Sequence, residues 1–445
     1  MKTSMAVIAS LIAARRPVCA ALFVASITTL GSGCSTLLPA AAPAPATSAP
    51  AAPPSVATAP APAAPPVVAA PPVVAAPAPP PVLPLDDALL AAANNLFSSA
   101  SKTLTMPPAQ RLLVIDPLVD GVSHTQTVTT QSLETKIQGL VRSKYPGFNA
   151  QPFSRATVGQ APIVLVGTFT AIDLKNQTGG ARDAFRICLA LADLKSGLIV
   201  AKGVARAQIE GVNQTPLPHL QDAPAWIKDP SVDAYVQTCQ GTKPGDRIDP
   251  AYLDGILAAS LIAEASDLFD GGRYQDAIEV YRSALSTPKG DQLRVHNGLY
   301  SANWKLGRRA DAERAFGEVV RVGLASNRLG VKFLFRPGST DFVSDARLSA
   351  PYSMWMGQIA QRASARAACL QVVGHTSPTG PEPLNERLSV LRAENVKNRL
   401  EREAPKLKGR VIASGVGSRE KLVGTGTDDV RDALDRRVEF KVVPC

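Results

Sequence analysis

The eleven residues LQVVGHTSPTG, Leu370–Gly380, are the most informative part of this 445-residue sequence. Leu370–Val373 is a short apolar run with β-branched residues, which predicts a buried strand. Gly374–Gly380 contains two glycines and a proline, which predicts a loop. Helical periodicity begins directly after it. The sequence therefore predicts a strand, a glycine-bearing loop and a helix in direct succession.

The helix after this loop is expected to present two neighbouring stripes of side chains. The predicted core stripe consists of Leu384, Leu388, Leu391 and Val396. Asn385, Ser389 and Arg392 are spaced by four and three residues, so they share a second stripe facing the loop. A guanidinium near a helix N-terminus can bind a carboxylate, because free N–H donors and the positive dipole end lie there. The alternative is an arginine on a merely solvated helix face.

Strands are predicted on both sides of this segment, because apolar and polar residues alternate there. The alternating apolar positions are Val331, Phe333 and Phe335 before the segment, and Val438, Phe440 and Val442 after it. Strands and helices thus follow one another in a region that reaches from residue 329 to residue 445. We predict an α+β fold for it.

The spacing of these residues resembles the OmpA C-terminal family. The matching positions are Gly374-His375-Thr376, Gly380, Asn385, Leu388-Ser389, Arg392-Ala393, Val396, Leu400, Gly415 and Asp435-Arg436-Arg437-Val438. The resemblance implies a βαβαββ domain with a mixed sheet over residues 329–445. It also implies non-covalent binding of peptidoglycan, through the free amine and carboxylate of diaminopimelate in the stem peptide.

The same resemblance assigns roles to individual residues. Arg392 matches the arginine that takes the ligand's carboxylate, and Asn385 and Arg436 match supporting polar contacts. The resemblance also places His375, Thr376 and Ser377 in the ligand-binding loop.

Two positions depart from the family pattern. The family's loop reads Gly-His-Thr-Asp, and its aspartate receives the ligand's ammonium, whereas this chain has Ser377 there. The family often has an aspartate after the first strand, whereas Arg336 follows Phe335 here. Loss of a charge-assisted contact costs about 1.5–3 kcal/mol. Three outcomes follow: weakened wall binding, a changed ligand such as a stem without a free amine, or a domain kept for protein contacts alone.

Residues 250–328 are predicted to be helical, with two similar units. Gly272-Arg273-Tyr274, Ala277 and Tyr281 are repeated 35 residues later as Gly307-Arg308-Arg309, Ala312 and Phe316. This pattern resembles tetratricopeptide repeats. Two units are fewer than such stacks usually need, so we expect this region to pack on a neighbouring domain or partner. It is either a protein-docking groove or a helical spacer.

Residues 86–249 are predicted to form an α/β domain. Strands are expected at Arg111–Val119, Ile163–Phe169, Phe185–Leu191 and Leu198–Val204, and a helix at Thr129–Tyr145. Asp193–Gly197, DLKSG, predicts the turn between the last two strands. Val164–Gly167, the LALADL strand end and Asp193–Val200 resemble the periplasmic family that includes LpoB, FlgO and CsgG. The resemblance implies a protein-binding role.

The N-terminus indicates export. Residues 1–33 contain Lys2, Arg15 and Arg16, then an apolar run and small residues, as in a secretory signal peptide. Cys34 follows and resembles the acylated cysteine of a lipobox, although Gly31 stands where a leucine is usual. Ser35 fits sorting to the outer membrane. Ordinary cleavage without lipid and an uncleaved anchor are the alternatives.

Residues 34–85 are predicted to be an Ala/Pro-rich linker. No charged residue occurs between Ser35 and Pro84, and 17 prolines fall between Pro39 and Pro84. Such a segment cannot bury a core and favours extended polyproline II. We expect a spacer that holds the folded domains away from the membrane.

Export also bears on the cysteines that remain after Cys19 and Cys34. Four thiols in an oxidising compartment suggest two disulfides, with three connectivities open. We favour Cys188–Cys239 and Cys369–Cys445, because each pair then stays within one domain; free buried thiols are the alternative.

Composition and motifs argue against several functional classes. The formal net charge is +10, and six of these charges lie in residues 329–445, which suits an anionic partner or simply aids solubility. The four histidines show no metal-ligand spacing, and neither a nucleophile elbow nor a phosphate-binding loop is found. We predict neither a metal nor a cofactor, no enzymatic activity and no nucleic-acid binding.

The expected function is that of an outer-membrane lipoprotein on the periplasmic face. It would bind peptidoglycan through residues 329–445 and scaffold envelope proteins through the two preceding domains. The alternative is an accessory subunit of a secretion, pilus or flagellar machine, in which the OmpA-like domain binds protein. Both hypotheses follow from the resemblances above and from the export signal.

Overall fold

The computed structural model describes residues 80–445 except 109–110, 227, 328 and 337. The predicted signal peptide over residues 1–33, the predicted lipidation site Cys34 and most of the predicted linker lie outside the described residues. The described residues belong to one compact unit. Among the described helices, none is both long and apolar enough to cross a membrane.

A six-stranded sheet organises the first half of this unit, in the order β1-β6-β5-β4-β2-β3. Its strands are β1 (Val82–Leu83), β2 (Leu112–Ile115), β3 (Asn149–Ala150), β4 (Ile163–Ile172), β5 (Ala184–Asp193) and β6 (Leu198–Ala207). β4, β5 and β6 are successive antiparallel neighbours, whereas β1, β2 and β3 pair in parallel. The four strands predicted in this region and their order along the chain are confirmed.

The turn between β5 and β6 forms for the reason that its sequence indicated. The Asp193 carboxylate accepts the Lys195 N–H at 3.1 Å and the Ser196 N–H at 3.3 Å. Gly197 then takes a φ of 73°, which side chains other than glycine rarely adopt. Asp193 consequently pairs with Leu198 at the start of β6.

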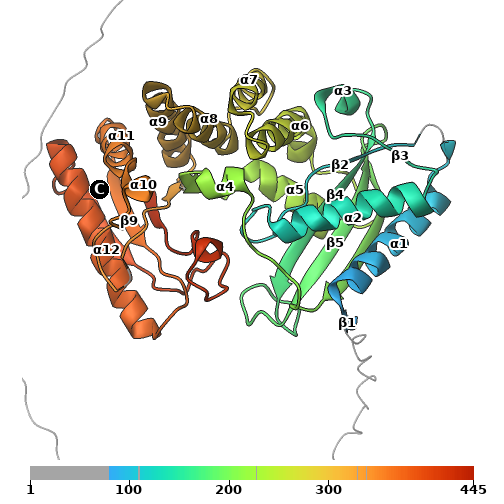
Figure 1. Ribbon diagram of the computed structural model, residues 1–445, viewed down its shortest axis with the longest axis horizontal. Helices are drawn as coiled ribbons and strands as arrows, with labels where there is room; N and C mark the ends of the chain where they lie inside the picture. Colours follow the sequence, from blue (N-terminus) through green and yellow to red (C-terminus); the bar gives the residue numbers. More distant parts are fainter. Residues whose placement is uncertain (1–79, 109–110, 227, 328, 337) are drawn as a thin grey trace, which may run out of the picture. The chain divides into compact units, whose positions relative to one another are not determined.

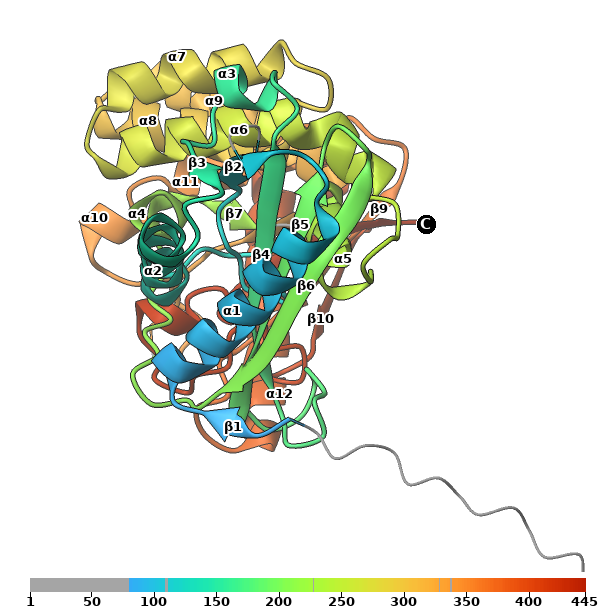
Figure 2. The ribbon, with the colours of Figure 1, turned by 90° about the vertical axis from the view of Figure 1, so that its right-hand side faces the viewer.

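Helices cover both faces of this sheet, which explains why β4 is buried along its whole length. α1 (Leu85–Thr103) crosses β5 and β6 on one face (Figure 2), and α2 (Val128–Lys144) packs on the same side. α5 (Pro230–Gln240) and the first part of α6 (Pro250–Asp270) pack on the other face. Short helices α3 (Arg155–Val158) and α4 (Pro218–Asp222) lie in the connections.

The end of the predicted linker belongs to the fold. Val82 and Leu83 pair in parallel with Arg206 and Ala207 of β6, and α1 begins at Leu85. The expectation of an extended spacer as far as Pro84 is therefore wrong for its last residues. Pro81 and Pro84 flank a two-residue strand at the sheet edge, where a missing N–H donor is tolerated.

Four helices follow as two consecutive hairpins (Figure 1): α6, α7 (Tyr274–Leu285), α8 (Leu293–Lys305) and α9 (Arg309–Ala325). Gly272 and Gly307, the first residues of the two repeated motifs, have φ values of 76° and 73° at equivalent turns. The Tyr281 ring packs directly against Gly298, and a Cβ at position 298 would overlap that ring. The helical prediction is confirmed, and the likeness to tetratricopeptide repeats stays a prediction.

The C-terminal sheet has the order β10-β9-β11-β8-β7. Its strands are β7 (Ala225–Trp226), β8 (Leu329–Val331), β9 (Cys369–Gly374), β10 (Val411–Gly415) and β11 (Val438–Val443). Its helices are α10 (Ala346–Ser349), α11 (Tyr352–Ser364) and α12 (Glu382–Glu403), with short 3-10 turns at Pro405–Leu407 and Val430–Asp432. β9 and β10 are parallel, and β11 is antiparallel to β8 and β9, so the predicted mixed sheet is confirmed.

Two features of this sheet differ from expectation. The first strand ends at Val331, and Phe333 and Phe335 are buried beyond it rather than within a longer strand. β7, which comes from the predicted 86–249 domain, pairs antiparallel with β8 and extends the sheet. A strand of one predicted domain therefore completes the sheet of another.

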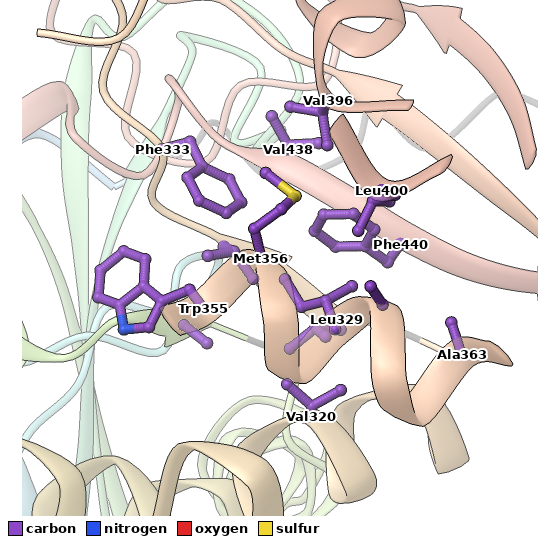
Figure 3. Close-up of a cluster of buried hydrophobic side chains, with 14 of the residues drawn as sticks. Val320, Leu329, Phe333, Trp355, Met356, Ala363, Val396, Leu400, Val438 and Phe440 are labelled. Carbon is purple, nitrogen blue, oxygen red and sulfur yellow. The ribbon is translucent and has the colours of Figure 1, made fainter. Parts of the chain in front are cut away.

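The helical hairpins share a core with the C-terminal sheet. Val320 of α9, Leu329 of β8 and Trp355 and Met356 of α11 gather beside Phe440 of β11 (Figure 3). The expectation that two repeats must pack on a neighbour is thereby confirmed. Apolar burial of this kind contributes roughly 25 cal/mol per Å² of area removed from water.

Both predicted disulfides are present. Cys188 of β5 joins Cys239 of α5 across 51 residues, and Cys369 of β9 joins Cys445 across 76 residues. The first links the sheet to a helix on its face, and the second ties the C-terminus to the central region of the C-terminal sheet.

Candidate ligand-binding site

The buried face of α12 is not the one that the leucines indicated. Its buried residues are Asn385, Ser389, Arg392, Ala393, Val396 and Leu400. Leu384 is 60% exposed and Leu391 is 39% exposed. The predicted leucine core stripe is therefore wrong, except for Val396, and the stripe with Asn385, Ser389 and Arg392 faces inward.

The backbone of α12 lies very close to the ends of β9 and β10, which explains why this face of the helix is buried. Gly374 and Gly415 are paired neighbours at the ends of β9 and β10. A Cβ at Gly374 would overlap the Ser389 carbonyl, and one at Gly415 would overlap the Ser389 side chain. Ser389 Oγ also accepts the Gly417 N–H at 3.0 Å. A serine fits this narrow space, and a leucine does not.

Arg392 is a buried cation, 5% exposed. Its Nε donates to the Ser339 carbonyl at 3.1 Å and its Nη2 to the Arg336 carbonyl at 3.3 Å. Its guanidinium lies over the Phe335 ring, 4.8 Å from the centroid. Within the described part of the chain, no carboxylate lies within ion-pair distance of Arg392. The site thus holds a positive charge that is fixed in position but not neutralised by direct pairing.

Electrostatics at Arg392 reflect this environment. Burial lowers the pKa of Arg392 to about 10, while the charge of Asp428 opposes the fall and that of Arg436 adds to it. The helix dipole has no role, because Arg392 is the eleventh residue of α12 and lies roughly 15 Å from its first residue. The expectation that a helix N-terminus assists this arginine is wrong, since dipole effects fade within one turn.

Ser377 of the glycine-bearing loop meets a carboxylate from a distant part of the chain. Its Oγ donates to Asp428 Oδ1 at 2.7 Å. Arg436 Nη1 donates to the same oxygen at 2.9 Å, and Arg436 Nη2 donates to the Asp429 carbonyl at 2.8 Å. Ser377, Asp428 and Arg436 therefore form one connected polar cluster.

The side-chain amide of Asn385 and the backbone N–H of Thr376 hold the glycine-bearing loop in place. Asn385 Nδ2 donates to the Thr379 carbonyl at 3.2 Å, and the Thr376 N–H donates to the Gly417 carbonyl at 2.9 Å. The Thr376 hydroxyl is buried without a hydrogen-bond partner. Their predicted roles in ligand binding stay predictions.

His375 lies apart from this cluster, beside Glu439 and Arg437. Its Nε2 is 3.6 Å from Glu439 Oε1, and burial lowers the pKa of this histidine. Glu439 also receives Arg437 Nε at 2.7 Å. Burial works to raise the pKa of Glu439, but contact with His375 and the charge of Arg437 bring it below its ordinary value.

His375, Glu439 and Glu420 bring one ligand atom each within 4.8 Å of one another. The two cations beside Glu439, Arg437 and Lys441, already meet its negative charge. This donor set therefore suits an internal ion-pair network better than a divalent metal ion.

Sequence reasoning missed Asp428 as part of the site. Asp428 is 51 residues from Ser377, and its loop carries no regular hydrophobic pattern. The only local signal is the acidic pair Asp428-Asp429 shortly before Asp435-Arg436, a pattern that is common in exposed loops. Tertiary packing alone brings it to Ser377.

Comparison with known proteins identifies a family for part of the C-terminal region. The OmpA family model matches residues 334–434. Residues 334–434 are an OmpA family domain. The match covers the loop, α12 and Arg392, and it leaves residues 80–333 unassigned. Among curated proteins, none matches this chain.

Three of the solved structures that are similar to this chain each cover about a quarter of it. An outer membrane protein from Borrelia burgdorferi is 23% identical over 26% of this chain and 87% of its own, with a TM-score of 0.20. The peptidoglycan-associated lipoprotein from Burkholderia pseudomallei is 22% identical over 25% and 88%, with a TM-score of 0.21. The periplasmic domain of Helicobacter pylori MotB is 18% identical over 26% and 72%, with a TM-score of 0.21.

Proposed function

We propose that this protein is an outer-membrane lipoprotein that binds peptidoglycan non-covalently through its OmpA family domain. We further propose that the domains before it scaffold other envelope proteins. The proposal joins three supports: the export and lipobox pattern of residues 1–34, the family match at residues 334–434, and the geometry around Arg392.

Arg392 is the observation that carries the proposal. A buried guanidinium without a paired carboxylate is costly unless a ligand supplies the missing charge. Two backbone carbonyls and an aromatic ring hold Arg392 in place, so little side-chain entropy is lost when a carboxylate binds. Stem peptides of peptidoglycan provide such carboxylates.

Sedimentation with purified sacculi tests this function. The full-length protein, kept soluble in detergent, should sediment with sacculi, and Arg392→Gln should lower the bound fraction at least tenfold. Arg387→Gln is the matched control, because Arg387 is an exposed arginine on the same helix. A folded Arg392→Gln protein that sediments like the wild type would contradict the proposal.

A second candidate function, an accessory subunit that binds protein through this domain, is favoured by the outer face of α12. Leu384 and Leu391 are exposed there, so apolar side chains of α12 face solvent. A double variant, Leu384→Ser with Leu391→Ser, leaves the surroundings of Arg392 unchanged. If envelope proteins that co-purify with the wild type are lost from this variant but kept by Arg392→Gln, and if the wild type does not sediment with sacculi, the second function would be supported.

The lipid anchor requires its own experiment. Labelling of cells with a palmitate analogue should mark the wild-type chain, and Cys34→Ser should abolish the label. An unlabelled wild-type chain would exclude lipidation at Cys34.

A further inference from the structure

The carboxylate of Asp428 lies beside Ser377, the loop residue that has a hydroxyl where the family pattern has an aspartate. Asp428 Oδ1 is 2.7 Å from Ser377 Oγ, and Ser377 is 5% exposed. The side chain of Asp428 is 41% exposed, so a ligand can reach its carboxylate. The carboxylate of Asp428, from a second loop, thus lies in direct contact with the hydroxyl of Ser377 in the glycine-bearing loop.

The backbone holds Asp428 in this position. The carboxylate of Asp432, which is fully buried, accepts the N–H groups of Thr425 at 2.8 Å, Thr427 at 2.9 Å and Asp428 at 3.1 Å. Asp428 has a φ of 57°, a left-handed conformation that aspartate and asparagine tolerate better than most residues. Its position is therefore set by the fold and not by the ligand.

Charged groups of both signs lie around Arg392. Arg392 has a guanidinium without a paired carboxylate, and Asp428 lies near enough to influence its pKa. Arg436 donates a hydrogen bond to one oxygen of the Asp428 carboxylate. It does not neutralise the positive charge of Arg392. Such a site suits a ligand that carries both a carboxylate and an ammonium.

We propose that Asp428 accepts the ammonium of a zwitterionic amino-acid end whose carboxylate binds Arg392, and so supplies the acid that Ser377 does not. This inference rests on the function proposed above and deepens it. It assigns the amine-recognising group of the site to a loop 51 residues away from the one that the family pattern indicates.

The geometry argues against a different role, in which Asp428 closes the site as an internal substitute for the ligand's carboxylate. Asp428 pairs with Arg436 and not with Arg392, whose two described hydrogen bonds go to backbone carbonyls. The guanidinium that lacks a paired carboxylate therefore stays available while Asp428 is in place.

Calorimetric titration of the full-length protein in detergent tests the assignment. The probes are a stem tripeptide ending in meso-diaminopimelate and the same tripeptide acetylated on its distal amine. Asp428→Asn is the main variant, because asparagine keeps the side-chain shape and tolerates the positive φ. Asp429→Asn is the control, since it removes the same charge from the same loop and the Asp429 carboxylate binds Arg431.

We expect Asp428→Asn to weaken binding of the free tripeptide roughly ten- to hundredfold, as for loss of one charge-assisted hydrogen bond. The acetylated probe should bind the wild type weakly and should not distinguish it from Asp428→Asn. Ser377→Asp, added to Asp428→Asn, should restore binding of the free tripeptide. Asp429→Asn should stay within about twofold of the wild type.

Unchanged or tighter binding by folded Asp428→Asn would overturn the assignment, and tighter binding of both probes would instead identify Asp428 as a closing group. The two proposals fail differently. If Arg392→Gln abolishes sacculus binding while Asp428→Asn has no effect, only the Asp428 assignment fails. If the wild type binds neither sacculi nor the tripeptide, the proposed function fails, and this inference fails with it.

Discussion

Replacing Gly374 by alanine tests the close packing that turns Arg392 inward. A Cβ at position 374 would lie 2.9 Å from the Ser389 carbonyl carbon and would overlap its oxygen, whereas ordinary contacts begin at 3.4 Å. Because these are backbone atoms, no rotamer change relieves the overlap. To restore an ordinary contact with that oxygen, α12 must move away from β9 by roughly 1 Å or more.

Overpacking of this kind costs about 1–3 kcal/mol, which exceeds the gain of about 0.4–1 kcal/mol from a less flexible unfolded chain. We therefore expect the melting temperature of Gly374→Ala to fall by roughly 2–8 °C in scanning calorimetry. Sacculus binding should weaken as well, since Arg392 moves with the helix.

Gly357→Ala provides the matched control. Gly357 lies in α11 of the same domain, and a Cβ there would meet nothing within 4 Å. Because alanine favours a helix over glycine by about 0.5–1 kcal/mol, this variant should melt higher than the wild type. A Gly374→Ala protein as stable as Gly357→Ala would refute the packing argument.

Two further predictions concern the stability of the whole unit. Reduction of Cys188–Cys239 or Cys369–Cys445 should each cost about 4 kcal/mol by the chain-entropy relation for loops of 51 and 76 residues, and should lower the melting temperature measured with and without reductant. Burial raises the pKa of Asp116 to about 7, although a hydrogen bond from Tyr252 works in the opposite direction. Between about pH 4 and 7, the folded chain therefore keeps a proton on Asp116 that the unfolded chain has lost. The free energy of unfolding should therefore fall with rising pH, by up to about 1.4 kcal/mol per unit, and denaturant titrations of Asp116→Asn should show a smaller slope over the same range.

Local patterns were sufficient where the physics is local. The β4–β5–β6 strands follow from their apolar β-branched runs, and the turn between the last two follows from Asp193 and Gly197. The strand, loop and helix around residues 370–403 were also predicted in the right order. In each case, neighbouring residues satisfy the hydrogen bonds and backbone angles that define the element.

The predicted face of α12 was wrong because helical periodicity cannot distinguish which of two stripes is buried. Four apolar positions suggested a leucine core, but the space between α12 and the paired strand ends at Gly374 and Gly415 admits only a small residue. That restriction arises from strand pairing across residues that are far apart in the sequence.

The sequence by itself therefore determined the main strands, the helical character of residues 250–328 and the helix after the glycine-bearing loop. It favoured the observed disulfide pairs but left the other connectivities open. Only the tertiary structure decided that β7 joins the C-terminal sheet, that Ser389 packs inward, and that Asp428 reaches Ser377. The physical reason is that hydrogen bonds between neighbouring residues are encoded locally. Contacts across 50 residues or more depend on how whole elements pack, which short-range pattern does not contain.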